Sequence, residues 1–533
     1  MKKILFQFVL FLFSISLTAQ SIPVGSIDYT DERLRNEQLL NFNVDKSSFT
    51  IRPLLRKSDS TQNSKKTNQF NFKILPVSLV QQYNSLLPLG RNDGVMIPSK
   101  GYQMKFSAGF FVSYKNLSFQ FNPEYVNAEN LPFEIFPDYI NSSVRLNYIR
   151  YLNTYDIPDR LGSSPYKKIF WGQSALNYRI GKVNIGISNE NLWWGPGKYN
   201  SLIMSNNAPG FIHFTFNSVK PISTPIGFFE WQLISGRLVE SGLDIPAEFY
   251  MVNGVNYKVL KSKEWRYLSG LTLNYQPKWI PGLYLGLNRV FQLYNNDLGK
   301  GFADYFPVIS PFQKKNVTDE DGKNRDQIAS LFLRWVFKES KAEIYFENGW
   351  NDHKQDFWDL LQDPSHSRAY TFGLGKIFTL ESGLNKYLKF NFENTLLQQS
   401  ASRIARPAGA WYQHGSVLHG YTHMSQVIGA GIGPGSNAQT LDISLWKKTD
   451  VFGFQVERYS HNLDFSHDVY TNYEIGEYNR RWVDLNFNVY VFKQIKKIGF
   501  NGRFTHSVVR NYQWQIPNNK NNFQIQLSLQ YQL

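Results

Sequence analysis

The densest run of aromatic and amide side chains in the sequence is Glu-Asn-Leu-Trp-Trp-Gly-Pro-Gly at residues 190–197, followed by Ser-Asn-Asn-Ala-Pro at 205–209. The rings of Trp193 and Trp194 could stack on the C–H faces of sugar rings, and the amides of Asn206 and Asn207 could donate to and accept from hydroxyls. These residue types favour glycan recognition. The alternative is a tryptophan belt beside a glycine turn at a membrane interface, and the residues alone leave both interpretations open.

A second polar and aromatic run covers residues 343–353 and continues at 363–370. Asp352 beside His353 resembles an acid/base pair. Adjacent residues of a strand point to opposite faces, however, and no elbow presents a nucleophile. We therefore expect no catalytic residue, and we treat Trp350, Asp352, His353 and Arg368 as candidate glycan contacts, with Arg368 available to an acidic sugar.

A third run begins at Trp411 and Tyr412, which are also candidate glycan contacts, and contains His414, His419 and His423. The histidines lack helical spacing and a carboxylate partner, so they are a weak metal signal. The glycines at 429–435 do not match a dinucleotide fingerprint, because no βαβ unit surrounds them. We expect no metal and no cofactor, and we predict a tightly folded glycine-rich loop.

The elements that must position these runs follow an export signal. Lys2 and Lys3 precede an apolar stretch at residues 4–17 and a small-residue cleavage site, so residues 1–19 are predicted to be a signal peptide. The chain has no cysteine, which excludes disulfides, thiolate metal sites and a lipoprotein anchor.

Residues 20–69 are predicted to form an N-terminal periplasmic segment. A short, weakly amphipathic helix is expected from Thr30, as its N-cap, to about Leu40, with Asp31 and Glu32 in the first turn. Residues 56–69 are polar and rich in lysine and serine, which is typical of a linker.

From residue 70 to residue 533 the apolar residues alternate with polar ones. At the C-terminus, for example, Phe523, Ile525, Leu527 and Leu529 alternate with glutamines and Ser528. Period two predicts β-strands. About eighteen strands are expected, near residues 70–82, 102–114, 116–127, 170–180, 183–190, 210–218, 226–238, 265–276, 283–294, 328–338, 341–349, 369–378, 387–398, 440–448, 451–459, 481–493, 498–510 and 522–533.

The connections between these strands alternate between tight turns, as at Lys115-Asn116 and Lys496-Lys497, and long segments, as at 128–169 and 399–439. Short turns on one side and long loops on the other indicate a transmembrane barrel of the outer membrane of a Gram-negative bacterium, with both termini on the periplasmic side. The predicted fold class is all-β: an antiparallel transmembrane barrel over residues 70–533 with a small N-terminal helical segment. A barrel of this size has an aqueous lumen unless it is filled, and the loops and residues 20–69 could fill it.

The charge balance is positive, with 57 Lys and Arg against 42 Asp and Glu and a formal net charge of +15. Nucleic acid is excluded as a partner of an exported barrel. Anionic lipopolysaccharide or an acidic surface glycan is the better match for the cations.

The same residues resemble the Wzi-type capsule-assembly outer-membrane proteins. The resemblance is carried by sequence pieces at residues 92–98, 123–124, 190–197, 205–209, 351–353, 366–370 and 419–422. It implies an 18-stranded barrel with an N-terminal helical segment, acting as an outer-membrane lectin that helps retain capsular polysaccharide on the cell. This chain offers one N-terminal helix rather than a clear bundle.

The sequence therefore predicts a non-enzymatic outer-membrane protein that binds and anchors capsular or other surface polysaccharide through its extracellular loops. Its expected partners are that polysaccharide, outer-membrane lipid and lipopolysaccharide, and the outer-membrane assembly machinery. One alternative is a channel or transporter for oligosaccharide or lipid, which needs an open lumen. A second alternative is an outer-membrane hydrolase acting through Asp352 and His353.

Overall fold

The computed structural model describes residues 19–41, 46–57, 70–137, 140–242, 250–309, 323–351, 357–380, 386–404, 406, 408–471 and 479–533. The predicted signal peptide before Ala19, residues 58–69 of the predicted linker, and Asp352 and His353 lie outside these residues.

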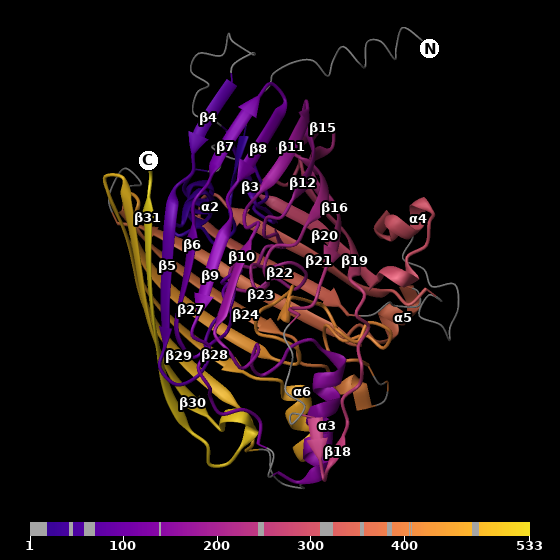
Figure 1. Ribbon diagram of the computed structural model, residues 1–533. Coiled ribbons are helices and arrows are strands. Elements are labelled where there is room, and N and C mark those ends of the chain that lie inside the picture. The colour runs from indigo at the N-terminus through magenta and orange to yellow at the C-terminus, as the bar shows by residue number, and fades with distance from the viewer. Residues whose placement is uncertain are drawn as a thin grey trace.

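The described chain forms one closed antiparallel β-barrel (Figure 1). Its hydrogen-bonded strands are β4 (Phe70–Ile74), β5 (Val77–Asn84), β6 (Gly101–Ser107), β7 (Phe110–Tyr114), β8 (Leu117–Phe121), β9 (Glu124–Ala128), β10 (Tyr166–Phe170), β11 (Ala175–Ile180), β12 (Val183–Ser188), β14 (His213–Ser218), β15 (Ile222–Thr224), β16 (Gly227–Leu238), β19 (Arg266–Pro277), β20 (Leu283–Tyr294), β21 (Asp326–Phe337), β22 (Ala342–Trp350), β23 (Arg368–Thr379), β24 (Lys386–Leu396), β27 (Asn437–Lys447), β28 (Asp450–Ser460), β29 (Val483–Ile495), β30 (Ile498–Arg510) and β31 (Lys520–Tyr531). Pairing of β31 with β5 closes the barrel.

Five of the strands that span the barrel are each interrupted by a short irregularity and therefore carry two labels. In each case the two pieces follow one another along the same neighbouring strands: β4 continues into β5, β6 into β7, β8 into β9, β10 into β11, and β14 into β15. Counted this way, the described residues form eighteen spanning strands. The predicted all-β barrel and its strand number are therefore confirmed.

The period-two pattern places apolar side chains outside the barrel and polar ones inside it. On β31, Leu527 is 42% exposed on the outer wall, whereas its neighbour Ser528 is 4% exposed. On β24, Lys389, Asn391 and Glu393 are buried in the lumen. The apolar outer face meets lipid, and the polar inner face lines the lumen. This arrangement is the reverse of that in a water-soluble protein, where apolar side chains point inward.

The two ends of the barrel differ as predicted. Short turns join β7 to β8, β11 to β12, β21 to β22, β27 to β28 and β29 to β30, at the end where the C-terminus lies (Figure 1). The opposite end, called the loop end below, carries α3 (Ser142–Thr154), α4 (Phe302–Tyr305), α5 (Phe357–Gln362), α6 (Leu463–Ser466), the π-helical turn η6 (His467–Thr471), the 3-10 turns η3 (Asn295–Asp297), η4 (Pro307–Ile309), η5 (Ala401–Ile404) and η7 (Tyr512–Trp514), and the strand pairs β17 (Met251–Val252) with β18 (Val255–Asn256) and β25 (Thr422–His423) with β26 (Gln426–Val427).

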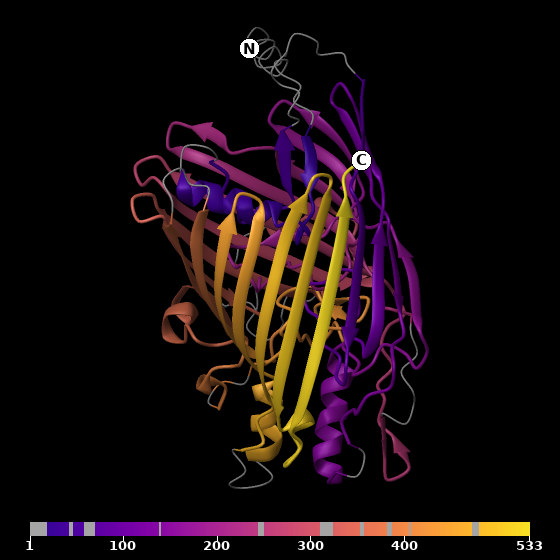
Figure 2. The same ribbon diagram turned by 90° about the vertical axis from the view of Figure 1, so that its left-hand side faces the viewer.

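The N-terminal segment lies inside the lumen near the short-turn end (Figure 2). It comprises β1 (Ala19–Ile22), paired with β3 (Leu54–Lys57); α2 (Thr30–Leu40); and β2 (Ile51–Arg52), paired with β13 (Trp193–Trp194). The predicted helix bounds are correct, but Thr30 is not the N-cap. Tyr29 holds that position with a left-handed backbone, and the Asp28 carboxylate accepts from the Thr30 N–H at 3.1 Å instead.

The helix α2 buries polar side chains, namely Arg35, Asn36 and Gln38, rather than an apolar stripe. Gln38 donates to the Tyr284 hydroxyl at 3.0 Å and Asn36 to the Tyr387 hydroxyl at 3.3 Å, so the lumen wall supplies its partners. A helix with so little amphipathicity is stabilised by this tertiary setting. No helix among the described residues is long and apolar enough to cross a membrane.

Candidate functional site: the lumenal plug and its pocket

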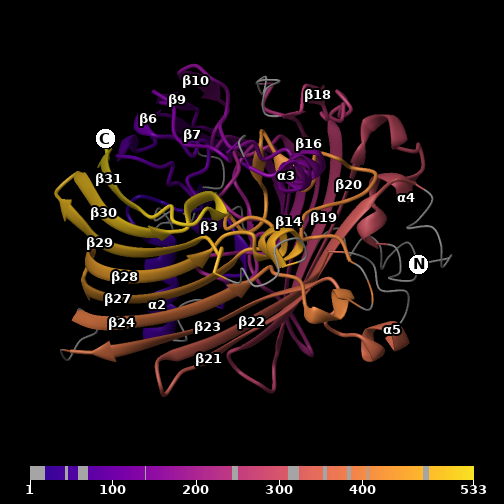
Figure 3. The same ribbon diagram turned by 90° about the horizontal axis from the view of Figure 1, so that it is seen from below.

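The middle of the lumen is filled by loop segments that enter from the loop end, where α6 and neighbouring loops cross the opening (Figure 3). They pack into an apolar cluster that includes Trp194, Leu202, Met204, Trp411 and Tyr412. Inward-facing wall residues such as Ile234, Leu268 and Val290 complete it. The loops therefore form a packed plug joined to the barrel wall.

The Trp-Trp-Gly-Pro-Gly run is the centre of this plug. Trp193 and Trp194 form β13, which pairs with β2, and the guanidinium of Arg52 lies 4.7 Å from the Trp193 ring centroid. Trp194 donates from Nε1 to Gln232 on the wall at 2.9 Å. Trp194 is 0% and Trp193 3% exposed, so one ring is enclosed by protein and the other already holds a cation on its face.

A wall carboxylate fixes the end of the same run. Glu393 on β24 accepts from the backbone N–H groups of Lys198 at 2.6 Å and Asn200 at 2.7 Å. A Cβ at Gly197 would lie 1.9 Å from the Asn200 carbonyl oxygen, so this tight turn requires glycine. The Trp-Trp-Gly-Pro-Gly motif, whose residue types favoured glycan recognition, therefore holds its loop folded inside the lumen.

Asn206 and Asn207 join three loops to one another. The Asn206 side chain donates to the Asn92 carbonyl at 2.8 Å, and the backbone carbonyl of Asn206 accepts from the Gly94 N–H at 2.7 Å. Asn207 donates to the Val427 carbonyl at 2.9 Å. Both amides are mainly engaged by backbone groups of the protein.

Trp411 and Tyr412 lie in the same cluster and are each 0% exposed. The Tyr412 hydroxyl donates to the Leu202 carbonyl at 2.9 Å and accepts from the Ala430 N–H at 2.8 Å. With Trp194, these rings offer no face to a sugar. The expectation that they stack on glycan is therefore corrected: large aromatics in these loops are buried because they fill the plug.

Trp350 and Arg368 occupy a different part of the molecule. They are directly paired at the loop end of β22 and β23, and their neighbours Gly349 and Ala369 face the lumen cluster. Alternation along the strands places Trp350 and Arg368 on the outer wall. The first and third sequence runs therefore meet in the plug, whereas Trp350 and Arg368 of the second run lie apart from it. Asp352 and His353 lie outside the described residues.

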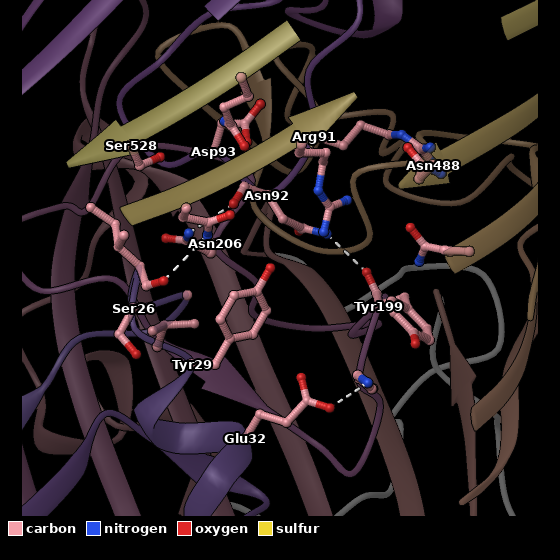
Figure 4. A pocket seen from close by; sticks show the side chains of 18 of the residues that line it. Ser26, Tyr29, Glu32, Arg91, Asn92, Asp93, Tyr199, Asn206, Asn488 and Ser528 are labelled. Atoms are coloured by element: carbon pink, nitrogen blue, oxygen red, sulfur yellow. Dashed lines mark hydrogen bonds and ion pairs between the residues drawn. The ribbon is translucent and has the colours of Figure 1, made fainter. Parts of the chain in front are cut away.

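A partly open pocket of about 370 Å³ lies between the N-terminal segment and the wall formed by β28 to β31 (Figure 4). Two of the sequence candidates, Trp193 and Asn206, line it. Its other polar lining includes Ser26, Tyr29, Arg91, Asn92, Asp93, Lys105, Lys198, Tyr199, Gln455, Glu457, Asn486, Asn488, Asn501, Arg503, Thr505, Gln524, Gln526 and Ser528.

Ion pairs organise two sides of this pocket. Lys198 lies 2.5 Å from Glu32 of α2, and Arg91 pairs with Glu457 on β28. Asp93, in the loop between β5 and β6, has a raised pKa because burial penalises its carboxylate, although Lys105, Arg503 and Arg91 oppose the shift.

Sequence reasoning missed this pocket, although residues 92–98 carry part of the family resemblance. Its lining comes mainly from the N-terminal segment, the loop between β5 and β6 and the wall strands β28 to β31, which are far apart in sequence. The wall residues share only an inward-facing position on their strands. Among the described residues no group of three or more His, Asp or Glu side chains could hold a metal ion. His419 and His423 make separate hydrogen bonds: Nδ1 of His419 shares one with the Tyr294 hydroxyl at 2.8 Å, and Nδ1 of His423 accepts from the Val239 N–H at 3.1 Å.

Comparison with known proteins supplies a relationship that the geometry alone does not. A family model described as capsule assembly protein Wzi matches residues 91–492. Among solved structures, Wzi of Escherichia coli, described as an outer-membrane protein involved in group 1 capsule assembly and a carbohydrate-binding β-barrel, is 11% identical with a TM-score of 0.59, covering 94% of this chain and 98% of that one.

More distant structures are OccAB2 and OccAB4 of Acinetobacter baumannii, each 10% identical with a TM-score of 0.40. The alignments cover 86% of this chain and 97% of OccAB2, and 87% of this chain and 99% of OccAB4. Among curated protein sequences, none is a significant match to this chain.

Proposed function

Because the chain belongs to the capsule assembly protein Wzi family, we propose that it is a lectin-like protein that binds surface polysaccharide and anchors it to the cell during capsule assembly. It is an outer-membrane β-barrel of a Gram-negative bacterium. The proposal extends to this chain the carbohydrate binding for which the Escherichia coli relative is described.

Besides family membership, the packed lumen supports the proposal. The apolar cluster around Trp194, Trp411 and Tyr412 is built from loops that are hydrogen-bonded to one another and to the wall. A barrel filled in this way is suited to holding a ligand rather than to conducting one, which disfavours the channel alternative. We propose no catalytic role for any residue.

Lipopolysaccharide is a further proposed partner, supported by arginines at the loop end of the outer wall. Arg237, Arg458 and Arg510 are exposed there, and each is adjacent in sequence to an inward-facing residue, so each faces the membrane side. Arg368 beside Trp350 has the same orientation. Guanidinium groups bind phosphates in a bidentate manner, which matches the anionic headgroups of the outer leaflet. The outer-membrane assembly machinery stays a proposed partner as for any such barrel.

The proposal is tested by measuring polysaccharide that is bound to cells and polysaccharide that is shed, in cells with and without the protein. Purified protein in detergent is assayed in parallel against the same polysaccharide and in a planar bilayer. We expect polysaccharide to be shed when the protein is absent, direct binding in detergent, and little conductance. Unchanged retention together with no binding by folded protein would reject the lectin function, and stable porin-sized conductance steps would favour the transporter.

A further inference from the structure

We propose that the lumenal pocket is a binding site for a short acidic saccharide of one or two rings that carries a carboxylate. The pocket is lined by Asn92, Asp93, Tyr199 and Asn488, among others (Figure 4). Arg503 belongs to the same lining. This inference rests on the proposed function, because it names the chemical unit of polysaccharide that the protein recognises and the place where it is held.

The size of the pocket suits a short saccharide and not a folded polymer. A volume of about 370 Å³ lies at the lower end of the range of roughly 300–1,000 Å³ that small-molecule sites occupy. The pocket is bounded by Ser26 to Tyr29 on the side of the N-terminal segment and by Leu89 to Asp93 on the side of the loop between β5 and β6.

The lining presents the hydrogen-bonding groups that sugars need. The amides of Asn486 and Asn488 come from β29 and that of Gln526 from β31, which also carries Ser528. The Thr505 hydroxyl lies on β30 between these two strands. Amide side chains both donate and accept, as sugar hydroxyls do. Such a wall can bind a ring of hydroxyls without an apolar platform, which the buried tryptophans do not provide.

Several buried polar atoms of the residues that line the pocket are unpaired within the described part of the chain. They include Oδ1 of Asn92, the hydroxyl of Tyr199 and Oδ1 of Asn486. Asn92 uses its Nδ2 to donate to the Tyr199 carbonyl at 2.8 Å, so the two residues are held side by side at the edge of the cavity. Buried polar groups are normally satisfied, and unpaired polar atoms of the residues that line the pocket fit a polyhydroxyl ligand that would pair with them.

The charge of the lining favours an anion. Seven cations (Arg35, Arg52, Arg91, Lys105, Lys198, Lys389 and Arg503) line the pocket against four carboxylates (Asp31, Glu32, Asp93 and Glu457). Arg91 and Lys198 are paired with Glu457 and Glu32. Arg503 lies 5.2 Å from the Tyr490 ring centroid, and no ion pair within 4.0 Å joins it to a described carboxylate. We therefore assign Arg503 as the cation that meets the carboxylate of the sugar.

The test compares two disaccharides by calorimetry on the full-length protein in detergent. They are cellobiouronic acid, which has one glucuronate ring, and cellobiose, in which that ring is neutral glucose. We expect tighter binding of cellobiouronic acid. Because a hydrogen bond between charged groups contributes strongly, Arg503→Gln should weaken cellobiouronic acid binding about tenfold or more and leave cellobiose binding unchanged.

The matched control is Arg458→Gln on β28, which removes the same charge from the outer wall and should change neither affinity. A second variant, Asp93→Asn, removes a negative charge from the pocket without leaving a cation unpaired and should strengthen cellobiouronic acid binding only. It keeps the test decisive if Arg503→Gln does not fold, as judged by heat-modifiability.

Equal affinity of the wild type for the two disaccharides, no binding of either, or unchanged binding of cellobiouronic acid in both pocket variants would overturn the assignment. If the wild type at the same time binds and retains the polysaccharide, the lectin function stands and only the lumenal site fails. If it binds neither polymer nor disaccharide, both fail.

Discussion

A buried wall carboxylate, Glu343, is one of the anchors of the N-terminal segment inside the lumen, and its removal should shift α2 toward release. Glu343 on β22 accepts from Arg35 Nε of α2 at 3.0 and 3.1 Å, and from Arg334 Nε of β21 at 2.7 Å. The side chains of Glu343 and Arg334 are 2% and 0% exposed. Replacing Glu343 by glutamine leaves two buried guanidinium groups without their shared counter-charge.

The magnitude follows from this geometry. Removing one partner of a buried ion pair costs about 3–5 kcal/mol. Arg334 keeps hydrogen bonds to Gln38 Oε1 at 2.7 Å and to the Ser48 carbonyl at 2.8 Å, which favours the lower end of that range. A loss of about 3 kcal/mol shifts the equilibrium between docked and released α2 about 100-fold toward release.

The assay is limited trypsin digestion of the folded protein in detergent, with mass spectrometry of cleavage after Arg33 and Arg35. When local opening is fast, cleavage tracks the population of the open form, so Glu343→Gln should raise the rate by about 100-fold. The control is Asp304→Asn, which breaks the exposed pair of Asp304 with Lys323 at the loop end and should leave cleavage of α2 unchanged. Equal cleavage rates for wild type and Glu343→Gln, with both heat-modifiable, would refute the attachment.

Three further predictions concern the plug, the pocket and the barrel. Trp194→Ala should lower the free energy of unfolding by about 3–5 kcal/mol through lost packing, because the Trp194 ring is fully buried. The measurement is the temperature of the heat-modifiability transition. A loss of glycan binding at unchanged stability would contradict the structural role. Binding of cellobiouronic acid should be tighter at about pH 5 than at about pH 8, because burial raises the pKa of Asp93 and protonation removes its repulsion of the sugar carboxylate. The charged groups that face Asp93 are Lys105, Arg503 and Arg91, and Glu457 is paired to Arg91. Asp93→Asn should therefore reduce the pH dependence of cellobiouronic acid binding measured by calorimetry. The protein should fractionate with the outer membrane and give a circular dichroism spectrum dominated by strand; a helix-dominated spectrum would reject the barrel.

Some features of this protein are local in sequence and could be predicted from it. The alternation of apolar and polar residues along a strand depends only on the two-residue period and on which face meets lipid. The positions of β24, β29 and β31 could therefore be predicted to within a few residues. The alternation of short turns and long loops is likewise local, and it determined the barrel. The helix at Thr30 could be predicted from its composition, whereas its cap could not, because the left-handed backbone at Tyr29 belongs to a tertiary contact with Tyr490 and Trp446.

The function of the aromatic motifs was decided by tertiary structure alone. Sequence shows that Trp194, Trp411 and Tyr412 lie in loops, and a loop aromatic is equally suited to stacking on a sugar or to filling a cavity. The barrel gives these loops a lumen to fill, so burial of apolar area draws the rings inward. The lumenal pocket has the same origin: Asn92 is hundreds of residues from Asn488 and Arg503 in the sequence, and only closure of the strands around α2 brings it to them.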